Sequence, residues 1–305
     1  MKLSVLRSYW KYNFGRNILL ILSRFLEVFG ILWLITEISS YYFSTTNNFL
    51  KPYWYLFLIF GLVWGIYNSW PKLKISHCLI NRDVQIEISI SDIFKQRGSF
   101  IIGSNTTFET STEIISPESI QGQFTKYYYD KIEHLDKDIS DELKDDNYSV
   151  LQDDRKGKVN DYPIGTVVKI KPKNQTAYFL AIAKLNNYGN ASGNFESLKI
   201  ALSNLWEFIG NRGDLDTLII PILGSGFTRL QNKRDEIIRE IIQSFIAANS
   251  EKKFTNKLII VISPKDYSES EYKLDLLKLD KYLEHLCEYT EFKNNQDVGV
   301  GQPIS

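Results

Sequence analysis

The sequence predicts a chain in two parts: a hairpin of two membrane-spanning helices, followed by an α/β domain. Three observations lead to this fold class. Two stretches among the first 70 residues are strongly apolar, and the remainder of the chain is not. From about Ile75 onward, strand-like and helix-like patterns alternate, which is typical of a sheet covered by helices on both faces. A length of 305 residues accommodates one such domain in addition to the hairpin.

Two apolar stretches, residues 18–38 and 52–70, predict the hairpin. They read ILLILSRFLEVFGILWLITEI and PYWYLFLIFGLVWGIYNSW. A helix needs about 20 mostly apolar residues to cross a bilayer, and both stretches come close to that length. A signal peptide would have a shorter apolar core followed by small residues, whereas aromatic residues and a second apolar stretch follow here. A buried helical hairpin of a soluble protein is the other alternative. The second stretch is aromatic and carries no charge, which favours a membrane span. We therefore expect a membrane segment at residues 1–74.

Basic residues that flank the two helices predict their orientation. They are Lys2, Arg7, Lys11 and Arg16 before the first helix, and Lys72, Lys74 and Arg82 after the second. Lys51 is the only basic residue in the turn between the helices. Because short flanks rich in Lys and Arg remain in the cytoplasm, both termini and the α/β domain are expected there, in a multi-pass protein.

Three ionisable residues lie within the first predicted span: Arg24, Glu27 and Glu37. Arg24 and Glu27 are three positions apart, so they share a helix face and can form an ion pair. Charged groups inside a bilayer usually face a protein interior or water. One interpretation is a self-associating helix that lines a pore or a packed oligomer. The other is an intrahelical pair that only lowers the cost of insertion.

Alternating strand-like and helix-like segments predict the α/β domain, which we place at residues 75–292. Strands are expected at Val84–Ile90, Phe100–Ile102, Thr166–Ile170, Ala177–Leu185, Leu215–Leu223 and Leu258–Ile262. Helices are expected at Gly122–Leu143, Ser197–Ile209, Asp235–Ala248 and Lys273–Tyr289. The apolar stripe of the second helix is Leu198, Ala201, Leu202, Leu205 and Ile209. The charged stretch Asp136–Lys158 lacks a steady apolar period, and its second half is expected to be a surface insertion without chemistry. Residues 293–305 are expected to form a flexible tail.

The composition argues against several classes of function. Acidic and basic residues balance, with 36 of each, so the basic surplus typical of nucleic-acid-binding proteins is missing. The two cysteines, Cys78 and Cys287, lie far apart, and the three histidines are scattered. This pattern predicts a reducing compartment, no metal site and no disulfide framework. The sequence also lacks a nucleophile elbow, HExxH and CxxC, and so favours binding over catalysis.

Ligands of open α/β sheets bind at the carboxyl ends of the strands, where several turns here carry suitable residues. The turn Pro221–Phe227, PILGSGF, has glycines that allow consecutive amides to form an anion nest ahead of a helix. A plain tight turn is the alternative. The turn Gly103–Phe108 contains Asn105, whose side-chain amide can donate to and accept from a ribose hydroxyl. The alternative is that this amide holds its own turn through hydrogen bonds. Asp92 follows the first strand, and its carboxylate could accept a hydrogen bond from an adenine amino group or cap a turn.

A further turn, Ser116–Phe124, reads SPESIQGQF. In it, Ser119 and Gln121 are candidate donors to an anion, and Gly122 lies where a loop could enter a helix. The same residues fit a helix N-cap with Pro117 at the first helical position. The two interpretations are compatible with each other.

The order of these turns resembles the macro domain, an ADP-ribose-binding α/β fold with three layers and a mixed sheet. The matching segments are Ser91-Asp92-Ile93-Phe94 for the family's Gly-Asp-Ile-Thr turn, Ile102-Gly103-Ser104-Asn105 for its Asn-Ala-Ala-Asn, and Pro221–Gly226 for its second phosphate loop. By this resemblance Asp92 takes the adenine amine, Asn105 the distal ribose, and the loop around Gly224 the diphosphate. The ligand-binding residues that the resemblance and the turns imply are Asp92, Ile93, Asn105, Thr106, Phe108, Ser119, Gln121, Gly122, Gln123, Leu223, Gly224, Ser225, Gly226 and Phe227.

Two transmembrane helices followed by such a domain resemble the membrane-bound, ThsA-type effectors of type II Thoeris antiphage systems. The most specific part of this resemblance is the pair ISPESIQGQF and PILGSGFTRL. It implies a protein of the bacterial inner membrane that binds an ADP-ribose signal, expected to be a histidine conjugate, made from NAD by a partner TIR-domain enzyme. It further implies homo-oligomerisation and membrane disruption, with Arg24, Glu27 and Glu37 as assembly residues, and neither a metal nor a further cofactor.

Two alternatives concern the same ligand. A membrane-tethered ADP-ribosyl hydrolase would need a base near the distal ribose, for which Asp92 and Glu109 are the nearby carboxylates. Residues 119–124 replace the family's Gly-rich first loop, which is a departure from its pattern. Ile102 stands in place of the family's first Asn, which argues against hydrolysis. A passive ADP-ribose reader that recruits modified proteins is the second alternative. We expect a sensor without enzymatic activity.

Overall fold

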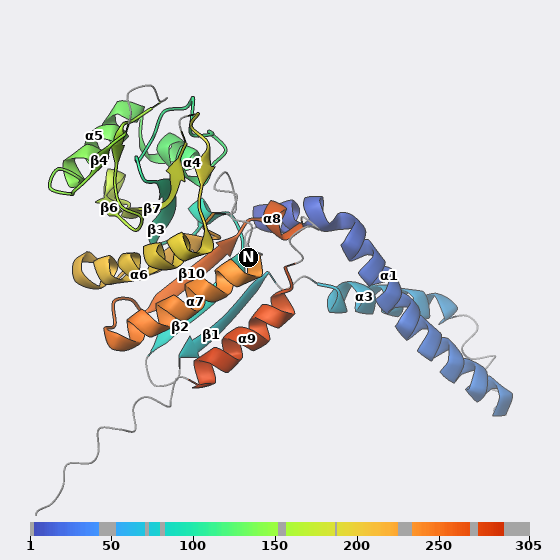
Figure 1. Ribbon diagram of the computed structural model, residues 1–305. Coiled ribbons are helices and arrows are strands. Elements are labelled where there is room, and N and C mark those ends of the chain that lie inside the picture. The colour runs from blue at the N-terminus through green and yellow to red at the C-terminus, as the bar shows by residue number, and fades with distance from the viewer. Residues whose placement is uncertain are drawn as a thin grey trace, which may run out of the picture. The chain divides into compact units, whose positions relative to one another are not determined.

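The computed structural model describes residues 3–42, 53–70, 73–79, 83–151, 157–186, 188–224, 234–268 and 274–289. The chain divides into two compact units, Met1–Leu73 and Lys74–Ser305. Figure 1 shows the first unit as helices and the second as a sheet with helices. The predicted tail, residues 293–305, lies outside the described residues.

The first unit contains α1 (Leu3–Tyr42) and α3 (Trp54–Asn68). α1 begins well before residue 18, since no proline interrupts the preceding residues. Its segment Asn17–Tyr42, of 26 residues and mean hydropathy 2.2, is long and apolar enough to cross a membrane. α3 has 15 residues and spans roughly 22 Å, which is shorter than a hydrocarbon core of about 30 Å. Among the described residues, one helix thus meets the criterion for a span where the sequence predicted two.

α1 and α3 pack against each other through two glycines of α3. A Cβ atom on Gly61 would lie 3.0 Å from the ring of Phe25, and one on Gly65 would lie 2.9 Å from the carbonyl oxygen of Ile21. The two glycines are four positions apart and therefore lie on one face of the helix. Small residues at this spacing let apolar helices approach closely. Larger side chains at either glycine would push the two helices apart.

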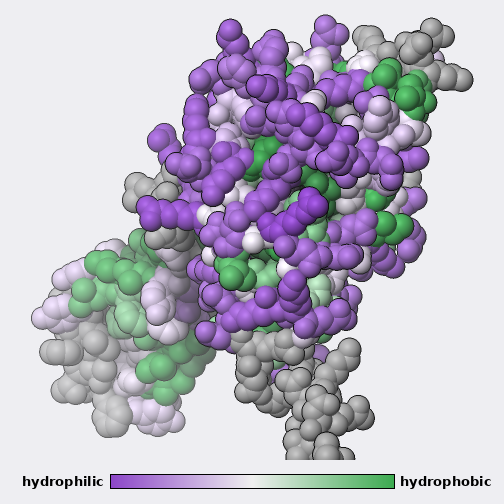
Figure 2. All heavy atoms as spheres, turned by 90° about the vertical axis from the view of Figure 1, so that its left-hand side faces the viewer, coloured by the Kyte–Doolittle hydropathy of each residue, from purple (hydrophilic) through white to green (hydrophobic). Residues whose placement is uncertain are grey.

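The outward surface of the first unit is apolar. Its exposed large side chains include Leu19, Leu26, Trp33, Ile59 and Val63. Figure 2 shows hydrophobic residues on the surface of this unit, and a mostly hydrophilic surface on the face of the second unit that is turned to the viewer. Such an apolar surface is unfavourable in water and favourable in lipid.

The second unit contains one large sheet and a two-stranded ribbon. The strands are β1 (Lys74–Leu79), β2 (Val84–Ile90), β3 (Ser99–Asn105), β4 (Ser149–Val150), β5 (Asn160–Asp161), β6 (Val167–Ile170), β7 (Ala177–Leu185), β8 (Ala191–Ser192), β9 (Leu218–Pro221) and β10 (Lys257–Ile262). The helices are α4 (Ile120–Tyr128), α5 (Ile132–Glu142), α6 (Phe195–Arg212), α7 (Arg234–Glu251), α8 (Pro264–Ser268) and α9 (Leu276–Tyr289), with the 3-10 helices η2 (Ile93–Lys95) and η3 (Pro172–Asn174).

The large sheet is mixed, as predicted. Its order is β1-β2-β10-β9-β3-β7-β6, with β8 paired to β7, while β4 and β5 form the ribbon. The five strands from β2 to β7 run parallel, and β1 and β6 are antiparallel to their neighbours. Parallel strands that are covered on both faces need continuous apolar sequences, which explains LIIP in β9 and KLIIVI in β10.

Helices cover both faces of this sheet, so the second unit has three layers (Figure 1). On one face, residues of α4 and α5 join a core with alternate strand residues such as Phe100 and Phe179. On the other face, α6 packs on β7 and on α7, where the rings of Trp206 and Phe245 lie 5.5 Å apart. The three-layer α/β/α architecture is therefore the predicted one.

The apolar stripe of α6 is confirmed. The buried residues of the helix include Leu198, Ala201, Leu202, Leu205 and Ile209, as expected. The helix begins two residues earlier than predicted, at Phe195, because Asn194 caps it. Oδ1 of Asn194 accepts a hydrogen bond from the backbone N–H of Ser197 at 2.7 Å.

The prediction of one helix over Gly122–Leu143 is wrong, since the segment forms α4 and α5. Tyr129 leaves the helical conformation, with φ −120° and ψ 138°, while its N–H still donates to the carbonyl of Thr125. Its hydroxyl donates to Asp138 in α5 at 2.6 Å. The residues at this break include neither glycine nor proline, so the local sequence does not indicate it. The contact between Tyr129 and α5 accompanies the break instead.

Candidate functional site

The parallel strands β2, β3, β9 and β10 end at the same edge of the sheet, which is where ligands bind in open α/β sheets. η2 follows β2, the turn Asn105–Thr110 follows β3, and the residues after Pro221 follow β9. The sheet therefore brings the turns of Asp92, Asn105 and Gly224 to one edge, as the sequence predicted for the three turns.

Asp92 caps η2 and leaves part of its carboxylate exposed. Its Oδ1 accepts from the backbone N–H of Phe94 at 3.1 Å, and its Oδ2 lies 3.1 Å from Nζ of Lys95. The turn-capping role that the sequence suggested is thus present. The side chain is 36% exposed, so the carboxylate also remains accessible to a ligand at the edge of the sheet.

Asn105 organises the turn after β3. Its Oδ1 accepts from the N–H of Thr107 at 3.1 Å, from the hydroxyl of Thr107 at 2.8 Å and from the N–H of Glu109 at 3.0 Å. The side-chain oxygen therefore holds the turn, as one of the two interpretations expected. Nδ2, which has two hydrogens to donate, takes no part in these three bonds.

Besides Asn105 and Gln121, each 5% exposed, four predicted ligand-binding residues are buried: Ile93, Thr106, Phe108 and Leu223 are at most 7% exposed. Phe108 has φ +47°, and its ring meets that of Tyr162 edge-on at 5.8 Å. Oγ1 of Thr106 has no hydrogen-bond partner among the described residues. These side chains lie beneath the turns and support them, and their part in ligand binding stays a prediction.

The turn Ser116–Phe124 is a helix N-cap. Oγ of Ser119 accepts from the N–H of Gly122 at 3.0 Å and donates to the carbonyl of Ser116 at 2.6 Å. Ser119 is the cap, so Pro117 precedes it by two positions and does not occupy the first helical position as predicted. A Cβ atom on Gly122 would lie 2.4 Å from the carbonyl oxygen of Ser116, which explains the glycine by close packing.

Gln121, a predicted anion donor, forms hydrogen bonds within the protein. This side chain is buried, its Nε2 donates to the carbonyl of Glu109 at 2.6 Å, and its Oε1 accepts from Ser104 at 3.3 Å. Gln121 therefore braces the turn after β3. Nε2 of Gln123 donates to the carbonyl of Glu118 at 2.7 Å, which is likewise a bond within the turn.

The turn after β9 contains the first glycine of the predicted phosphate loop. Gly224 has φ +73°, a left-handed conformation that glycine adopts without strain. Backbone in this conformation is a component of anion nests. The predicted residues Ser225, Gly226 and Phe227 lie outside the described residues.

The chain matches a known family over its α/β domain. The family model described as "Thoeris protein ThsA, Macro domain" matches residues 86–263, more than half of the chain. The chain belongs to the ThsA macro-domain family. Its matched region runs from β2 through β10 and so includes all three turns of the candidate site.

Similar proteins include a curated relative and solved macrodomains. The Thoeris protein ThsA of Bacillus amyloliquefaciens (strain Y2) is 25% identical over 214 residues, which cover 65% of this chain and 67% of that protein. The Oceanobacillus iheyensis macrodomain with MES bound has a TM-score of 0.48 and 14% identity, covering 70% of this chain and 98% of that one. The same macrodomain with ADP has a TM-score of 0.47 and 14% identity, covering 68% and 97%.

Glu109 of the macro domain has a role that the sequence did not reveal. Its side chain is buried, Oε1 accepts from the backbone N–H of Thr110 and Ser111 at 2.9 Å each, and Oε2 accepts from the N–H of Lys158 at 2.7 Å. A carboxylate held by three backbone donors positions a turn. Three of its about four acceptor positions are thus occupied by backbone donors.

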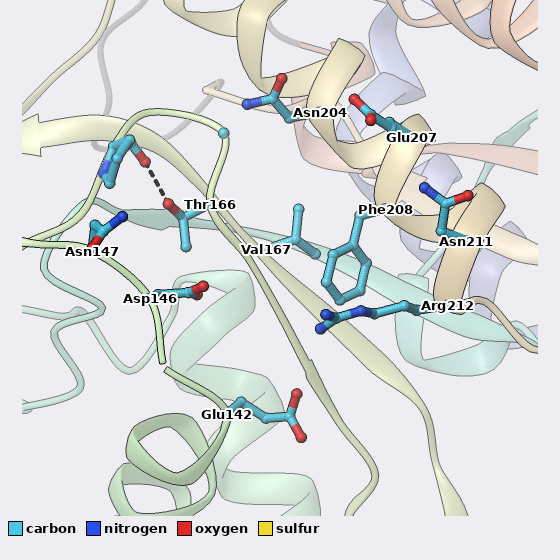
Figure 3. A pocket seen from close by; sticks show the side chains of 12 residues that line it. Glu142, Asp146, Asn147, Thr166, Val167, Asn204, Glu207, Phe208, Asn211 and Arg212 are labelled. Carbon is cyan, nitrogen blue, oxygen red and sulfur yellow. Dashed lines mark hydrogen bonds between the residues drawn. The ribbon is translucent and has the colours of Figure 1, made fainter. Parts of the chain in front are cut away.

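A cavity of about 430 Å³ lies elsewhere on the macro domain, beside the edge strand β6 (Figure 3). It is lined by Glu142, Asp146, Asn147, Pro163, Gly165, Thr166, Val167, Asn204, Glu207, Phe208, Asn211 and Arg212. The guanidinium of Arg212 lies 5.4 Å from the centre of the Phe208 ring. Because none of the predicted ligand-binding residues lines this cavity, it is separate from the candidate site.

The described residues contain no group of three or more His, Cys, Asp or Glu that could hold a metal.

The two cysteines, Cys78 and Cys287, differ in their environment. Cys78 is exposed, whereas burial raises the pKa of Cys287 to about 11. Since the thiolate is the reactive form, a maleimide at neutral pH is expected to label Cys78 at least about tenfold faster than Cys287. Mass spectrometry of the native protein measures both rates. Equal rates would contradict the burial of Cys287 and its raised pKa.

Proposed function

We propose that this protein is a membrane-anchored antiphage effector whose cytosolic macro domain senses an ADP-ribose signal. The observation that carries this proposal is the convergence of Asp92, Asn105 and Gly224 at one edge of the sheet, in a chain of the ThsA macro-domain family. In the proposed organisation residues 1–74 anchor the protein, and residues 75–292 bind the signal.

Each turn supplies one part of the proposed contacts. The accessible carboxylate of Asp92 accepts from the adenine amino group, and Nδ2 of Asn105 donates to the distal ribose. The backbone at Gly224, in its left-handed conformation, begins the cradle for the diphosphate. The side chains beneath these turns are buried, and Asn105 and Gln121 hold the turn after β3 through hydrogen bonds, so this turn is formed before the ligand arrives. Preformed turns of this kind reduce the entropic cost of binding.

Sensing is favoured over hydrolysis by the state of the two nearby carboxylates. Glu109 accepts from three backbone N–H groups, and Asp92 caps η2 and pairs with Lys95. Neither is left as an unengaged base beside the distal ribose. Incubation of the protein with an ADP-ribosylated protein substrate tests this point. Catalytic release of ADP-ribose would favour the hydrolase alternative, and its absence would favour a sensor.

The proposed signal is an ADP-ribose derivative, a histidine conjugate, made by a partner TIR-domain enzyme. A ligand shifts an equilibrium only by its differential affinity for two states. The proposal therefore requires an assembled form that binds the signal more tightly than the resting form does. Assembly would bring the α1–α3 hairpins of several copies together in the inner membrane and disrupt it.

The ion pair in α1 is the feature through which the hairpins are proposed to associate. Nη1 of Arg24 and Oε2 of Glu27 are 2.8 Å apart, and their side chains are 53% and 55% exposed. In lipid, such a pair is stabilised when further protein or water surrounds it. Arg24→Leu is therefore expected to lower signal-induced dye leakage from liposomes by at least about tenfold, while the unassembled form still binds the signal with the affinity of the wild-type resting form.

The matched control for this variant is Ser23→Leu, which alters the neighbouring exposed position without removing a charge. It is expected to leak like the wild type. Undiminished leakage by Arg24→Leu would mean that the pair only lowers the cost of inserting the helix. If an ADP-ribose conjugate failed to induce leakage by the wild-type protein, the effector role itself would be rejected.

A further inference from the structure

Residues 157–162, here called the strap, contact the turn after β3 at several points. The backbone N–H of Lys158 donates to Oε2 of Glu109 at 2.7 Å, and its Nζ donates to the carbonyl of Phe108 at 2.8 Å. The N–H of Tyr162 donates to the carbonyl of Thr106 at 2.9 Å. Three hydrogen bonds thus join the strap to consecutive parts of one short turn.

The strap is itself held in place. It includes β5, which pairs with β4, and the N–H of Leu151 donates to the carbonyl of Val159 at 2.9 Å. Nζ of Lys158 also lies 2.6 Å from Oδ1 of Asp136 in α5, and the hydroxyl of Thr110 donates to the same oxygen. The Lys158 ammonium and the turn are therefore both tied to α5, whose inner face belongs to the core.

Close packing explains the first residue of the strap. Gly157 has φ +88°, and a Cβ atom at this position would lie 2.1 Å from Oε2 of Glu109. Any side chain here would displace either the strap or the Glu109 carboxylate. The charged insertion, which the sequence suggested was without chemistry, thus has a specific contact at its C-terminal end.

We propose that the strap positions the turn Asn105–Thr110 for the terminal ribose of the ligand, with Lys158 as the positioning residue. This inference rests on the proposed function, which assigns Nδ2 of Asn105 to that ribose. Lys158 touches the carbonyl of Phe108 and the carboxylate of Asp136 and is not assigned to the ligand. Its contribution is to hold Asn105 in the geometry that the ribose requires, since a displacement of about 1 Å weakens a positioned contact strongly.

The test compares ADP-ribose with ADP, which lacks the terminal ribose, as ligands of full-length protein in detergent. Lys158→Met keeps the aliphatic part of the side chain and removes the two hydrogen bonds of Nζ, to the carbonyl of Phe108 and to Asp136. It is expected to weaken ADP-ribose binding by about tenfold and ADP binding by less than about twofold. Lys158→Arg is expected to restore part of the ADP-ribose affinity. Thr110→Val, which removes only the hydroxyl bond to Asp136, is expected to act more weakly in the same direction.

Lys144→Met is the matched control, because Lys144 forms an exposed pair with Asp141 in the same charged region. It is expected to bind both nucleotides like the wild type. Amide hydrogen exchange of the unliganded proteins gives a second measurement: residues 106–111 are expected to exchange faster in Lys158→Met and to be unchanged in Lys144→Met.

Equal losses for ADP and ADP-ribose in Lys158→Met, or no loss for either, would overturn the inference. Unchanged exchange of residues 106–111 would also overturn it, even if the variant bound ligand poorly. The histidine conjugate is titrated alongside and takes the place of ADP-ribose in the comparison if the wild type binds only the conjugate. Failure of the wild type to bind any of these ligands would instead reject the proposed function, and the positioning of the ribose would fall with it.

Discussion

Gly224→Glu is expected to weaken the binding of ADP-ribose by at least about a hundredfold, equivalent to roughly 2.7 kcal/mol. Two effects act together. Gly224 has φ +73°, so any other residue is strained there and is expected to move the backbone that begins the phosphate cradle. The added carboxylate also repels the diphosphate, an effect that is stronger where water is partly excluded. Calorimetric titration of the full-length protein in detergent measures the change.

The matched control for this variant is Gly165→Glu. Gly165 also has a positive φ, of +88°, but lines the cavity beside β6 that is separate from the candidate site. This variant has the same backbone strain and the same added charge, and its affinity for ADP-ribose is expected to match that of the wild type. If both variants lost affinity equally, the effect would be one of stability. Wild-type affinity in Gly224→Glu would place the diphosphate elsewhere.

Simultaneous replacement of Lys74 and Lys257 by Met is expected to lower the free energy of unfolding by about 3–5 kcal/mol. Both ammonium groups contact Oε2 of Glu87 in β2, at 2.8 and 2.6 Å. The Glu87 side chain is 4% exposed, so without either lysine it would be a buried charge without a partner. Breaking a buried pair from one side is costly for this reason.

Chemical denaturation of the purified full-length variants measures this effect. Lys257→Met alone is expected to cost more than Lys74→Met, because the Lys257 side chain is 27% exposed and that of Lys74 is 54% exposed. Lys144→Met, which removes an exposed pair, is expected to change stability by less than about 1 kcal/mol. A double variant within about 1 kcal/mol of the wild type would show that water solvates Glu87 in the native state.

Much of the fold was predictable because local sequence patterns match the burial that the sheet imposes. β2 and β7 have the predicted boundaries, since Val84–Ile90 alternates apolar and polar residues and Ala177–Leu185 is almost continuously apolar. The mixed three-layer architecture follows from the alternation of such strands with amphipathic helices. The Arg24–Glu27 ion pair was also predictable, because a spacing of three residues places both side chains on one helix face.

Other elements depend on tertiary contacts that no local pattern reveals. The break between α4 and α5 rests on the hydroxyl of Tyr129 and its bond to Asp138. β1 lies at the edge of the sheet with a mixed pattern of exposure and pairs only with β2 within the sheet, so its sequence KISHCL has no strong strand signal. The lengths of α1 and α3 differ from the predicted spans because hydropathy locates apolar residues and not the ends of helices.

The candidate site shows the same division. The turns of Asp92, Asn105 and Gly224 were predictable, because the ends of parallel strands meet at one edge of the sheet. The roles of Gln121, Glu109 and Lys158 were not, because each depends on a hydrogen bond across a distance in sequence that spacing cannot indicate. The buried positions of Phe108 and Thr106 depend likewise on how the turn after β3 folds back on the core.

The most direct test of the central proposal is a calorimetric titration of the full-length protein in detergent with ADP-ribose and with its histidine conjugate. The account predicts tight binding of the conjugate, weaker binding of ADP-ribose, and recovery of both ligands unchanged afterwards. The binding of neither ligand by a folded protein would contradict it, and the turns of Asp92, Asn105 and Gly224 would then be structural features without this ligand.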